Sequence, residues 1–309
     1  MPVEKLTIST PAKINLFLEI TGKRRDGYHD ICSLIEKINL FDTIEIFPSD
    51  KNKVEFTGQW QIPEENTVSK TIENLCCLFP DISKTHPLRI VVHKNIPPGS
   101  GLGGASSDAA AVLKACNIVW KLNLDEDSMR NIAIKIGSDV PLFLKDGPCI
   151  IEGKGEIVRY IERLPHLFFE VFVPDIQIST RMVYENVSEK QISDLTQAHS
   201  RIKIFLSAWK QNDIEKMEKL LFNRLEEVTL GINKEIGQFK NWLESELGKC
   251  FMLTGSGGGL YAIGKHNEQT TLKLPVITRQ WKHYSVESYS GWPQKEEQHG
   301  NYRNKNFAD

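Results

Sequence analysis

The stretch Pro97-Pro98-Gly99-Ser100-Gly101-Leu102-Gly103-Gly104-Ala105-Ser106-Ser107-Asp108 contains four glycines followed by two serines, directly before a helical pattern. Glycine has no Cβ, so the backbone N–H groups of such a loop can approach phosphate oxygens closely. The free N–H groups and the positive dipole end of the following helix attract negative charge. Residues 97–107 are therefore predicted to hold phosphate groups. The hydroxyls of Ser106 and Ser107 are expected at the start of the helix.

Other glycine-loop templates fit this stretch less well. The glycines at 99, 101 and 104 match the dinucleotide fingerprint G-x-G-x-x-G, but that loop follows its strand at once and needs an acidic residue about 20 positions later, after a second strand. Here two prolines intervene, and the nearest candidate, Asp125, lies at an expected helix start. The P-loop template fails because Ala-Ser stands where Lys-Ser/Thr is required. A glycine-rich turn that only caps a helix remains the alternative for this loop in isolation.

The composition is that of a soluble globular protein. The chain has 309 residues, enough for two domains that each bury a core. It carries 38 Lys and Arg against 40 Asp and Glu, a net charge of -2. This balance gives no bulk electrostatic reason to expect a nucleic-acid partner or an anionic membrane.

The cysteines and the apolar runs indicate a cytoplasmic protein. The six cysteines form no C-x-x-C motif and have no nearby histidines at zinc-site spacing, so we expect reduced, mostly buried thiols. The longest apolar runs, such as residues 167–169, are far too short to span a membrane, and the N-terminus lacks a signal-peptide core.

Strands and helices alternate in the first half of the sequence. Residues of alternating polarity predict half-buried strands, and apolar residues at helical spacing predict packed helices. The predicted elements are strands over 12–20, 31–46 and 88–92, a turn at Asp26-Gly27, and helices from Ser107 onward and over 125–136, the last capped by Gly137.

The second half is richer in helices. The predicted elements are a strand over 168–173, helices near 179–187, 200–211, 213–230 and 233–247, and a strand-turn-strand over 251–263. We expect a domain boundary near 160, which gives an N-terminal domain over 1–160 and a C-terminal domain over 161–278. Residues 279–309 are rich in polar and charged residues and are predicted to form a weakly ordered tail or a small appended element.

Three further segments accompany the glycine stretch: Pro11-Ala12-Lys13-Ile14-Asn15-Leu16, Arg25-Asp26-Gly27-Tyr28-His29 and Gly137-Ser138-Asp139-Val140-Pro141. In this order and spacing, the four segments resemble the GHMP small-molecule kinases, over roughly residues 8–264. Thr254-Gly255-Ser256-Gly257 is similar to the second glycine loop of that family. The Arg-x-Asp-Gly-Tyr-His pattern resembles the branch of the family that phosphorylates 4-diphosphocytidyl-2-C-methyl-D-erythritol.

The resemblance implies a two-domain α+β kinase fold. Its N-terminal domain would be like ribosomal protein S5 domain 2 and its C-terminal domain ferredoxin-like, with a deep cleft between them. The implied cofactors are ATP and Mg²⁺, and the implied partner is the small-molecule substrate. The implied reaction transfers phosphate from ATP to the 2-hydroxyl of that substrate.

Two residues match the catalytic positions of the family. Transfer to an alcohol needs a base for the hydroxyl proton and a cation beside the reacting oxygens. Asp139 matches the catalytic aspartate and Lys13 the catalytic lysine. Taken alone, Asp139 suits a helix cap before Pro141 better, and Lys13 suits a solvent-facing strand position better; only the joint match of the segments favours the catalytic roles.

Other residues match substrate-binding positions. Asn15 shares a strand face with the catalytic lysine and so can reach the same ligand. Tyr28 and His29 match positions at the cytosine, where an aromatic face stacks and an imidazole forms hydrogen bonds. Taken alone, they suit a packed hairpin tyrosine and a solvent histidine better. The remaining matches are Lys94, which would neutralise phosphate, and Thr180 and Tyr184, which would line the cleft.

The sequence departs from the family pattern at three places, and two rival functions stay open. Ala105 stands where glycine is usual, Arg224 where aspartate is usual, and Gly258-Gly259 replace larger residues. One rival is a mevalonate-pathway GHMP enzyme, including the diphosphate-decarboxylating lyase, although such enzymes bind no cytidine. The other is a nucleotide-binding regulatory protein that has kept the fold and lost turnover.

Overall fold

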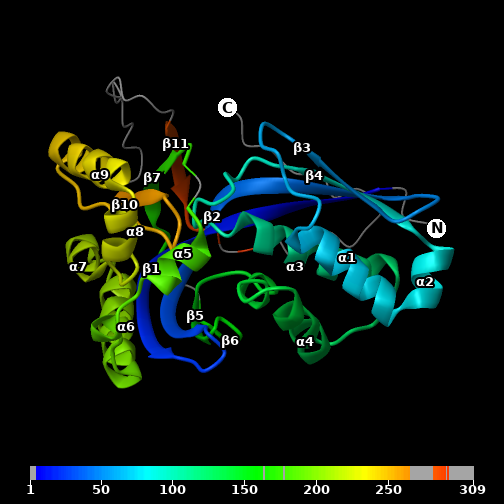
Figure 1. Cartoon of the computed structure of the whole chain (residues 1–309), viewed down its shortest axis with the longest axis horizontal. Helices are drawn as coiled ribbons and strands as arrows, with labels where there is room; N and C mark the ends of the chain where they lie inside the picture. The colour runs from blue at the N-terminus through cyan, green and yellow to red at the C-terminus, as the bar shows by residue number, and fades with distance from the viewer. Residues whose placement is uncertain (1–4, 163, 177, 265–280, 290, 292–309) are drawn as a thin grey trace.

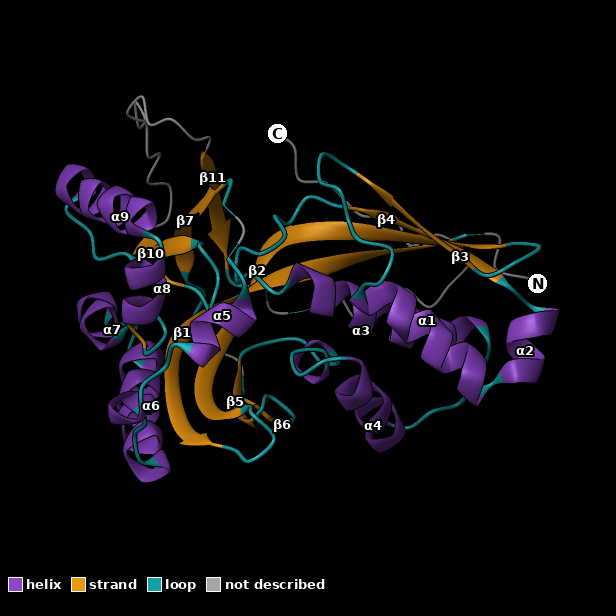
Figure 2. Cartoon of the chain, in the orientation of Figure 1, coloured by secondary structure: helices purple, strands orange, loops and turns teal. Residues whose placement is uncertain are grey.

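The computed structural model describes residues 5–162, 164–176, 178–264, 281–289 and 291 (Figure 1). Two sheets with helices packed around them make up this part of the chain (Figure 2). The mixed content agrees with the predicted α+β class. Among the described residues, no helix is long and apolar enough to cross a membrane. All six cysteines are free, but only Cys32, Cys116 and Cys149 are buried, so the expectation of mostly buried thiols holds for half of them.

The first sheet is built on two long strands. β1 (Leu6–Lys23) and β2 (His29–Pro48) pair antiparallel along their length, joined by a turn in which Gly27 has a φ of +85°. The strand order is β3-β4-β2-β1-β8, and β5 and β6 extend from β2. The other strands are β3 (Lys53–Thr57), β4 (Leu88–His93), β5 (Cys149–Gly153), β6 (Ile157–Tyr160) and β8 (Phe222–Asn223). The three strands predicted in this half are confirmed.

The second sheet has the order β11-β7-β10-β9. Its strands are β7 (Phe168–Pro174), β9 (Met252–Leu253), β10 (Leu260–Gly264) and β11 (Trp281–Glu287). β11 lies within the stretch predicted as a weakly ordered tail or a small appended element, and it pairs antiparallel with β7. Its aromatic and β-branched residues have high strand propensity. Residues 279–280, 290 and 292–309 of that tail lie outside the described part of the chain.

The helices pack on the sheets in two groups (Figure 1). The first group is α1 (Thr67–Leu78), α2 (Pro80–Thr85), α3 (Gly104–Val119) and α4 (Glu126–Ile136). The second group is α5 (Thr180–Glu185), α6 (Leu195–Lys210), α7 (Ile214–Leu220), α8 (Glu226–Ile232) and α9 (Lys234–Leu247). Short 3-10 turns span Pro141–Phe143 and Glu189–Gln191.

Two helix predictions need correction at their starts, and a third needs correction in its middle. α3 begins at Gly104 rather than Ser107, because Gly103 adopts a left-handed φ of +76° as its N-cap. α6 begins at Leu195, where the Asp194 side chain caps two backbone N–H groups. The single helix predicted over 213–230 is interrupted, because residues 222–223 leave the helical path and pair with β1.

A shared apolar core joins the two sheets. It brings Ile14 and Leu16 of β1 together with Phe169 of β7, Tyr261 of β10 and Trp209 of α6. All five side chains are at most 1% exposed. The strand that carries the first kinase-like segment is therefore packed against elements from the second half of the chain.

Candidate active site

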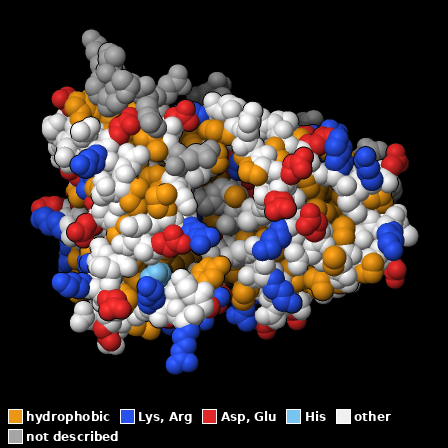
Figure 3. Space-filling model, viewed as in Figure 1, with side chains coloured by type: hydrophobic (Ala, Val, Ile, Leu, Met, Phe, Trp, Pro, Cys, Tyr) orange, Lys and Arg blue, Asp and Glu red, His pale blue; other side chains and the backbone are white. Residues whose placement is uncertain are grey.

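A cavity of about 910 Å³ lies where the glycine stretch meets both halves of the chain. Figure 3 shows the surface hollowed between the part that carries α6–α9 and the part that carries α1–α4. Most of the predicted site residues line this cavity: Lys13, Asn15, Tyr28, His29, Lys94, Pro97, Pro98, Gly99, Ser100, Gly101, Gly103, Gly104, Ala105, Ser106, Asp139, Thr180 and Tyr184. Leu102 and Ser107 do not line it. Leu102 packs in the shared core, and Ser107 is buried with no hydrogen-bond partner for its hydroxyl.

The first glycine loop is clamped between β1 and the second glycine loop. The Lys13 N–H donates to the carbonyl of Leu102 at 2.9 Å, and the Gly259 N–H donates to the carbonyl of Ser100 at 3.0 Å. Gly101 has a φ of +82°, and a Cβ placed on it would lie 1.9 Å from the carbonyl oxygen of Thr254. Only glycine fits at this contact. The first turn of α3 is thereby fixed at the cavity wall, as phosphate binding requires.

Lys13 is buried rather than solvent-facing, because the second glycine loop covers that face of β1. Its side-chain ammonium donates to the carbonyl of Gly101 at 2.5 Å and to the Asn15 side-chain oxygen. Burial lowers the pKa of Lys13, and the negative charge of Asp139 opposes that shift. Asp139 is half-buried and lines the same cavity. The Lys13 ammonium and the Asp139 carboxylate therefore line the same cavity.

Lys94 lies at the cavity but is already paired inside the protein. Its ammonium contacts Asp42 and Asp108, the latter at 2.7 Å, and all three side chains are at most 4% exposed. Thr10 donates a further hydrogen bond to Asp108 at 2.7 Å. Burial raises the pKa of Asp108 against the opposing effect of the Lys94 charge. A phosphate bound at Lys94, as predicted, would therefore share the lysine's positive charge with the carboxylates of Asp42 and Asp108.

The Tyr28-His29 pair lines the cavity. His29 is 6% exposed, and neither ring nitrogen has a hydrogen-bond partner in the described protein. Its ring lies 5.6 Å from that of Tyr184, at an interplanar angle of 30°. Burial lowers the pKa of His29, so the neutral ring offers one donor and one acceptor. Tyr28 is 59% exposed, with the Lys154 ammonium 4.8 Å from its ring centre.

The second glycine loop is held by the segment that includes the Arg224 departure. The Asn223 side-chain amide donates to the carbonyls of Leu253 at 2.8 Å and Gly255 at 2.7 Å. Arg224 makes a two-pronged ion pair with the buried Glu19 of β1, at 2.6 and 2.9 Å. On the rim of this loop, Ser256 donates to the hydroxyl of Thr180 at 2.9 Å.

Sequence reasoning missed several cavity-lining side chains, among them Lys154 and Thr67. Lys154 lines the cavity from the turn between β5 and β6. The flanking Gly153 and Gly155 were the available signal, since a charged residue between two glycines suits a tight, exposed turn. Thr67, which lines the cavity from the start of α1, has no motif around it that would have singled it out.

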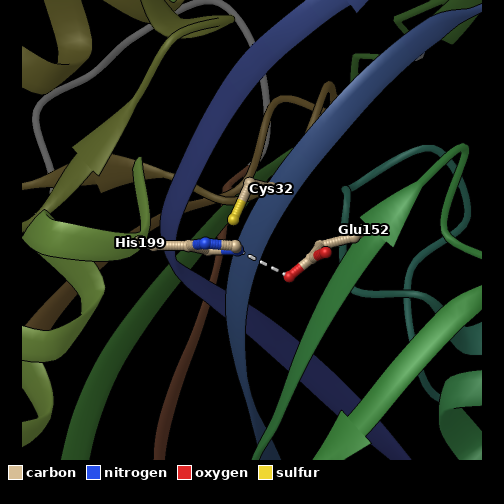
Figure 4. A group of neighbouring side chains, drawn as sticks. All are labelled: Cys32, Glu152 and His199. Carbon is tan, nitrogen blue, oxygen red and sulfur yellow. Dashed lines mark hydrogen bonds and ion pairs between the residues drawn. The ribbon is translucent and has the colours of Figure 1, made fainter. Parts of the chain in front are cut away.

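A second group of chemically capable side chains lies away from the cavity: Cys32 on β2, Glu152 on β5 and His199 on α6 (Figure 4). Their ligand atoms lie within 4.8 Å of one another. One oxygen of Glu152 already accepts from His199 at 2.8 Å and from the Arg159 guanidinium. With a positive guanidinium in place, this group ties α6 to β5 as an ion-pair cluster and is a poor cation site.

Comparisons with known proteins agree with this geometry. Residues 66–147 match the family model described as GHMP kinases N terminal domain. A 4-diphosphocytidyl-2-C-methyl-D-erythritol kinase of Carboxydothermus hydrogenoformans is 32% identical over 93% of this chain and 98% of its own length.

Solved structures share the fold. A 4-(cytidine 5'-diphospho)-2C-methyl-D-erythritol kinase superposes with a TM-score of 0.73 at 24% identity, over 92% of this chain and 100% of its own. A mevalonate pyrophosphate decarboxylase from Streptococcus pyogenes reaches 0.67 at 14% identity, over 94% and 98% of the two chains. These likenesses show a GHMP kinase fold, and the full-length sequence identity narrows the membership further. The chain belongs to the 4-diphosphocytidyl-2-C-methyl-D-erythritol kinase family of the GHMP kinases.

Proposed function

We propose that this protein transfers the γ-phosphoryl group of ATP to the 2-hydroxyl of 4-diphosphocytidyl-2-C-methyl-D-erythritol, a step in non-mevalonate isoprenoid precursor synthesis. Within the cavity, the first glycine loop binds the phosphates of ATP through backbone N–H groups. Asp139 takes the proton of the hydroxyl. Lys13 polarises that hydroxyl and balances charge on the transferring group.

The buried His29 ring is the observation that carries the substrate assignment. A buried polar atom without a partner costs about 1–3 kcal/mol, and His29 has two such nitrogens beside the Tyr184 ring. A neutral imidazole complements the mixed donor and acceptor edge of a cytosine. The exposed face of Tyr28 can stack on the same base. Thr180, which accepts a hydrogen bond from Ser256 of the second glycine loop, would then lie near the rest of the substrate.

The remaining assignments follow from the same proposal. Mg²⁺ would supply charge neutralisation on the phosphates, and the cavity offers the oxygen donors that this ion prefers, in Asp139 and Ser106. We assign residues 1–160 to an N-terminal domain like ribosomal protein S5 domain 2, and residues 161–278 to a ferredoxin-like C-terminal domain. We also propose a cytoplasmic location, with no nucleic-acid or membrane partner.

The test is ADP release by the purified protein with Mg·ATP. The cytidylylated methylerythritol is compared with mevalonate and its phosphates. We expect turnover only with the cytidylylated compound. Activity only with a mevalonate compound would keep the kinase chemistry and overturn the assignment of His29. Nucleotide binding without ADP release for any acceptor would favour the regulatory protein.

A further inference from the structure

A chain of hydrogen bonds runs beneath Lys13 into the first sheet. The Lys13 ammonium donates to the Asn15 side-chain oxygen, and the Asn15 amide nitrogen donates to the Ser33 hydroxyl at 2.9 Å. The Ser33 hydroxyl donates in turn to the carbonyl of Phe17 at 2.6 Å. The three side chains are at most 3% exposed, so water has little access to replace any link.

The hydrogen bond from Ser33 to Phe17 fixes which group donates and which accepts along the whole series. Because Ser33 donates its one hydroxyl proton to the carbonyl of Phe17, its oxygen can only accept a hydrogen bond from Asn15. The Asn15 NH₂ must therefore face Ser33, and its oxygen must face Lys13, which has only donors. A flipped amide would turn its NH₂ toward the ammonium and its oxygen toward the lone pairs of Ser33. The Thr254 hydroxyl lies 3.3 Å from the same Asn15 oxygen and 3.4 Å from the carbonyl oxygen of Gly101, and its one proton can go to either acceptor.

An irregularity in the strand pairing brings these residues together. Asn15 lies opposite Ile35, but Phe17 lies opposite Leu34, so the register of β1 on β2 shifts between them. Such shifts re-aim side chains and recur near functional sites.

We propose that Ser33 is a positioning residue: it fixes the Asn15 amide, which holds the Lys13 ammonium at the reacting hydroxyl. Two of the three N–H bonds of the ammonium go to Asn15 and the carbonyl of Gly101, which leaves the third for the cavity. Asn15, predicted above as a substrate-binding residue, then serves as the link to Lys13. The catalytic role of Lys13 in this proposal rests on the proposed function.

The central experiment compares Ser33→Ala with the wild type by kinetics and by NMR. Without the Ser33 oxygen, the Asn15 amide is free to flip, and the ammonium loses a fixed acceptor. We expect kcat to fall about tenfold through misplacement of Lys13, with KM for ATP and for the acceptor changed by less than about twofold. The pKa of Lys13, followed by the ¹³Cε shift of labelled lysine and assigned with Lys13→Arg, should fall.

Asn15→Asp supplies a change of opposite sign. Its carboxylate faces the ammonium, so the pKa of Lys13 should rise. Ser83→Ala is the matched control, because Ser83 is also buried and donates to a backbone carbonyl, that of Pro80, but on α2. It should leave both readouts unchanged.

Some outcomes would overturn the role of Ser33. These are a Ser33→Ala protein with wild-type kcat and Lys13 titration, or an Asn15→Asp protein whose only change is a higher KM for the acceptor. If Ser33→Ala does not fold, Ser33→Cys takes its place in both readouts, because it keeps a side chain of similar size with a much weaker acceptor. The NMR readout needs no turnover, so an inactive wild type would count against the proposed function and leave this test intact.

Discussion

Asp139 and Lys13 are the two charges that the proposed reaction needs, and one substitution tests the role of Asp139. Asp139→Asn keeps the size of the side chain and removes the base. We expect kcat to fall at least about a hundredfold, with ATP binding retained, as measured by ADP release and by calorimetry. Asp127→Asn, an exposed change on α4, is the control. Near-wild-type turnover by Asp139→Asn would contradict the role of base.

Glu36 makes stability depend on pH. Burial raises its pKa from 4.5 to about 8. The folded state therefore holds a proton that the unfolded state has lost between about pH 4.5 and 8, and stability falls as the pH rises through that window. Each pKa unit corresponds to about 1.4 kcal/mol.

Glu36→Gln should remove this loss. We expect its melting temperature to exceed that of the wild type at pH 9 and to match it at pH 5. Glu73→Gln, exposed on α1, should follow the wild type at both values. Equal melting temperatures of Glu36→Gln and wild type at pH 9 would contradict a raised pKa. Thermal unfolding followed by circular dichroism measures the difference.

At the scale of elements, the second glycine loop depends on a side chain that does not line the cavity. Asn223→Ala leaves the carbonyls of Leu253 and Gly255 without their donor. We expect a loss of about 1–3 kcal/mol in stability and higher KM values for both substrates, because this loop supports the first. Asn74→Ala, which removes one bond to Lys70 on α1, is the matched control. Unchanged KM values in Asn223→Ala would show that the loop holds its shape without it.

The elements also show what the sequence could and could not predict. Alternation along residues 12–20 and 31–46 found β1 and β2, since a half-buried strand repeats every two residues. The same rule placed Lys13 toward solvent, because periodicity cannot reveal a loop that arrives from residues 254–259. The helix over 213–230 was wrong for a similar reason: its break at β8 comes from a distant strand. Ser33 had no local signal at all.

On the scale of the whole molecule, the proposed domains at 1–160 and 161–278 are joined by a shared apolar core. Ile14 and Leu16 of β1 pack with residues of β7, β10 and α6, and Glu19 is paired with Arg224. We expect a single cooperative calorimetric transition for the full chain. A fragment of residues 1–160 expressed alone should not give the dispersed NMR spectrum of a folded domain, because its side of the shared core would face water. Two separate transitions would show that the halves fold independently.

The contact between the two glycine loops also limits how this enzyme can be re-engineered. No side chain can be added at Gly101 unless the loop at Thr254 moves as well, since 1.9 Å leaves no room for a methyl group. Most single random substitutions of Gly101 would therefore yield inactive variants. Libraries that seek a new acceptor should instead vary the wall around Tyr28, Lys154 and Tyr184, where one change at a time leaves the phosphate-binding backbone undisturbed.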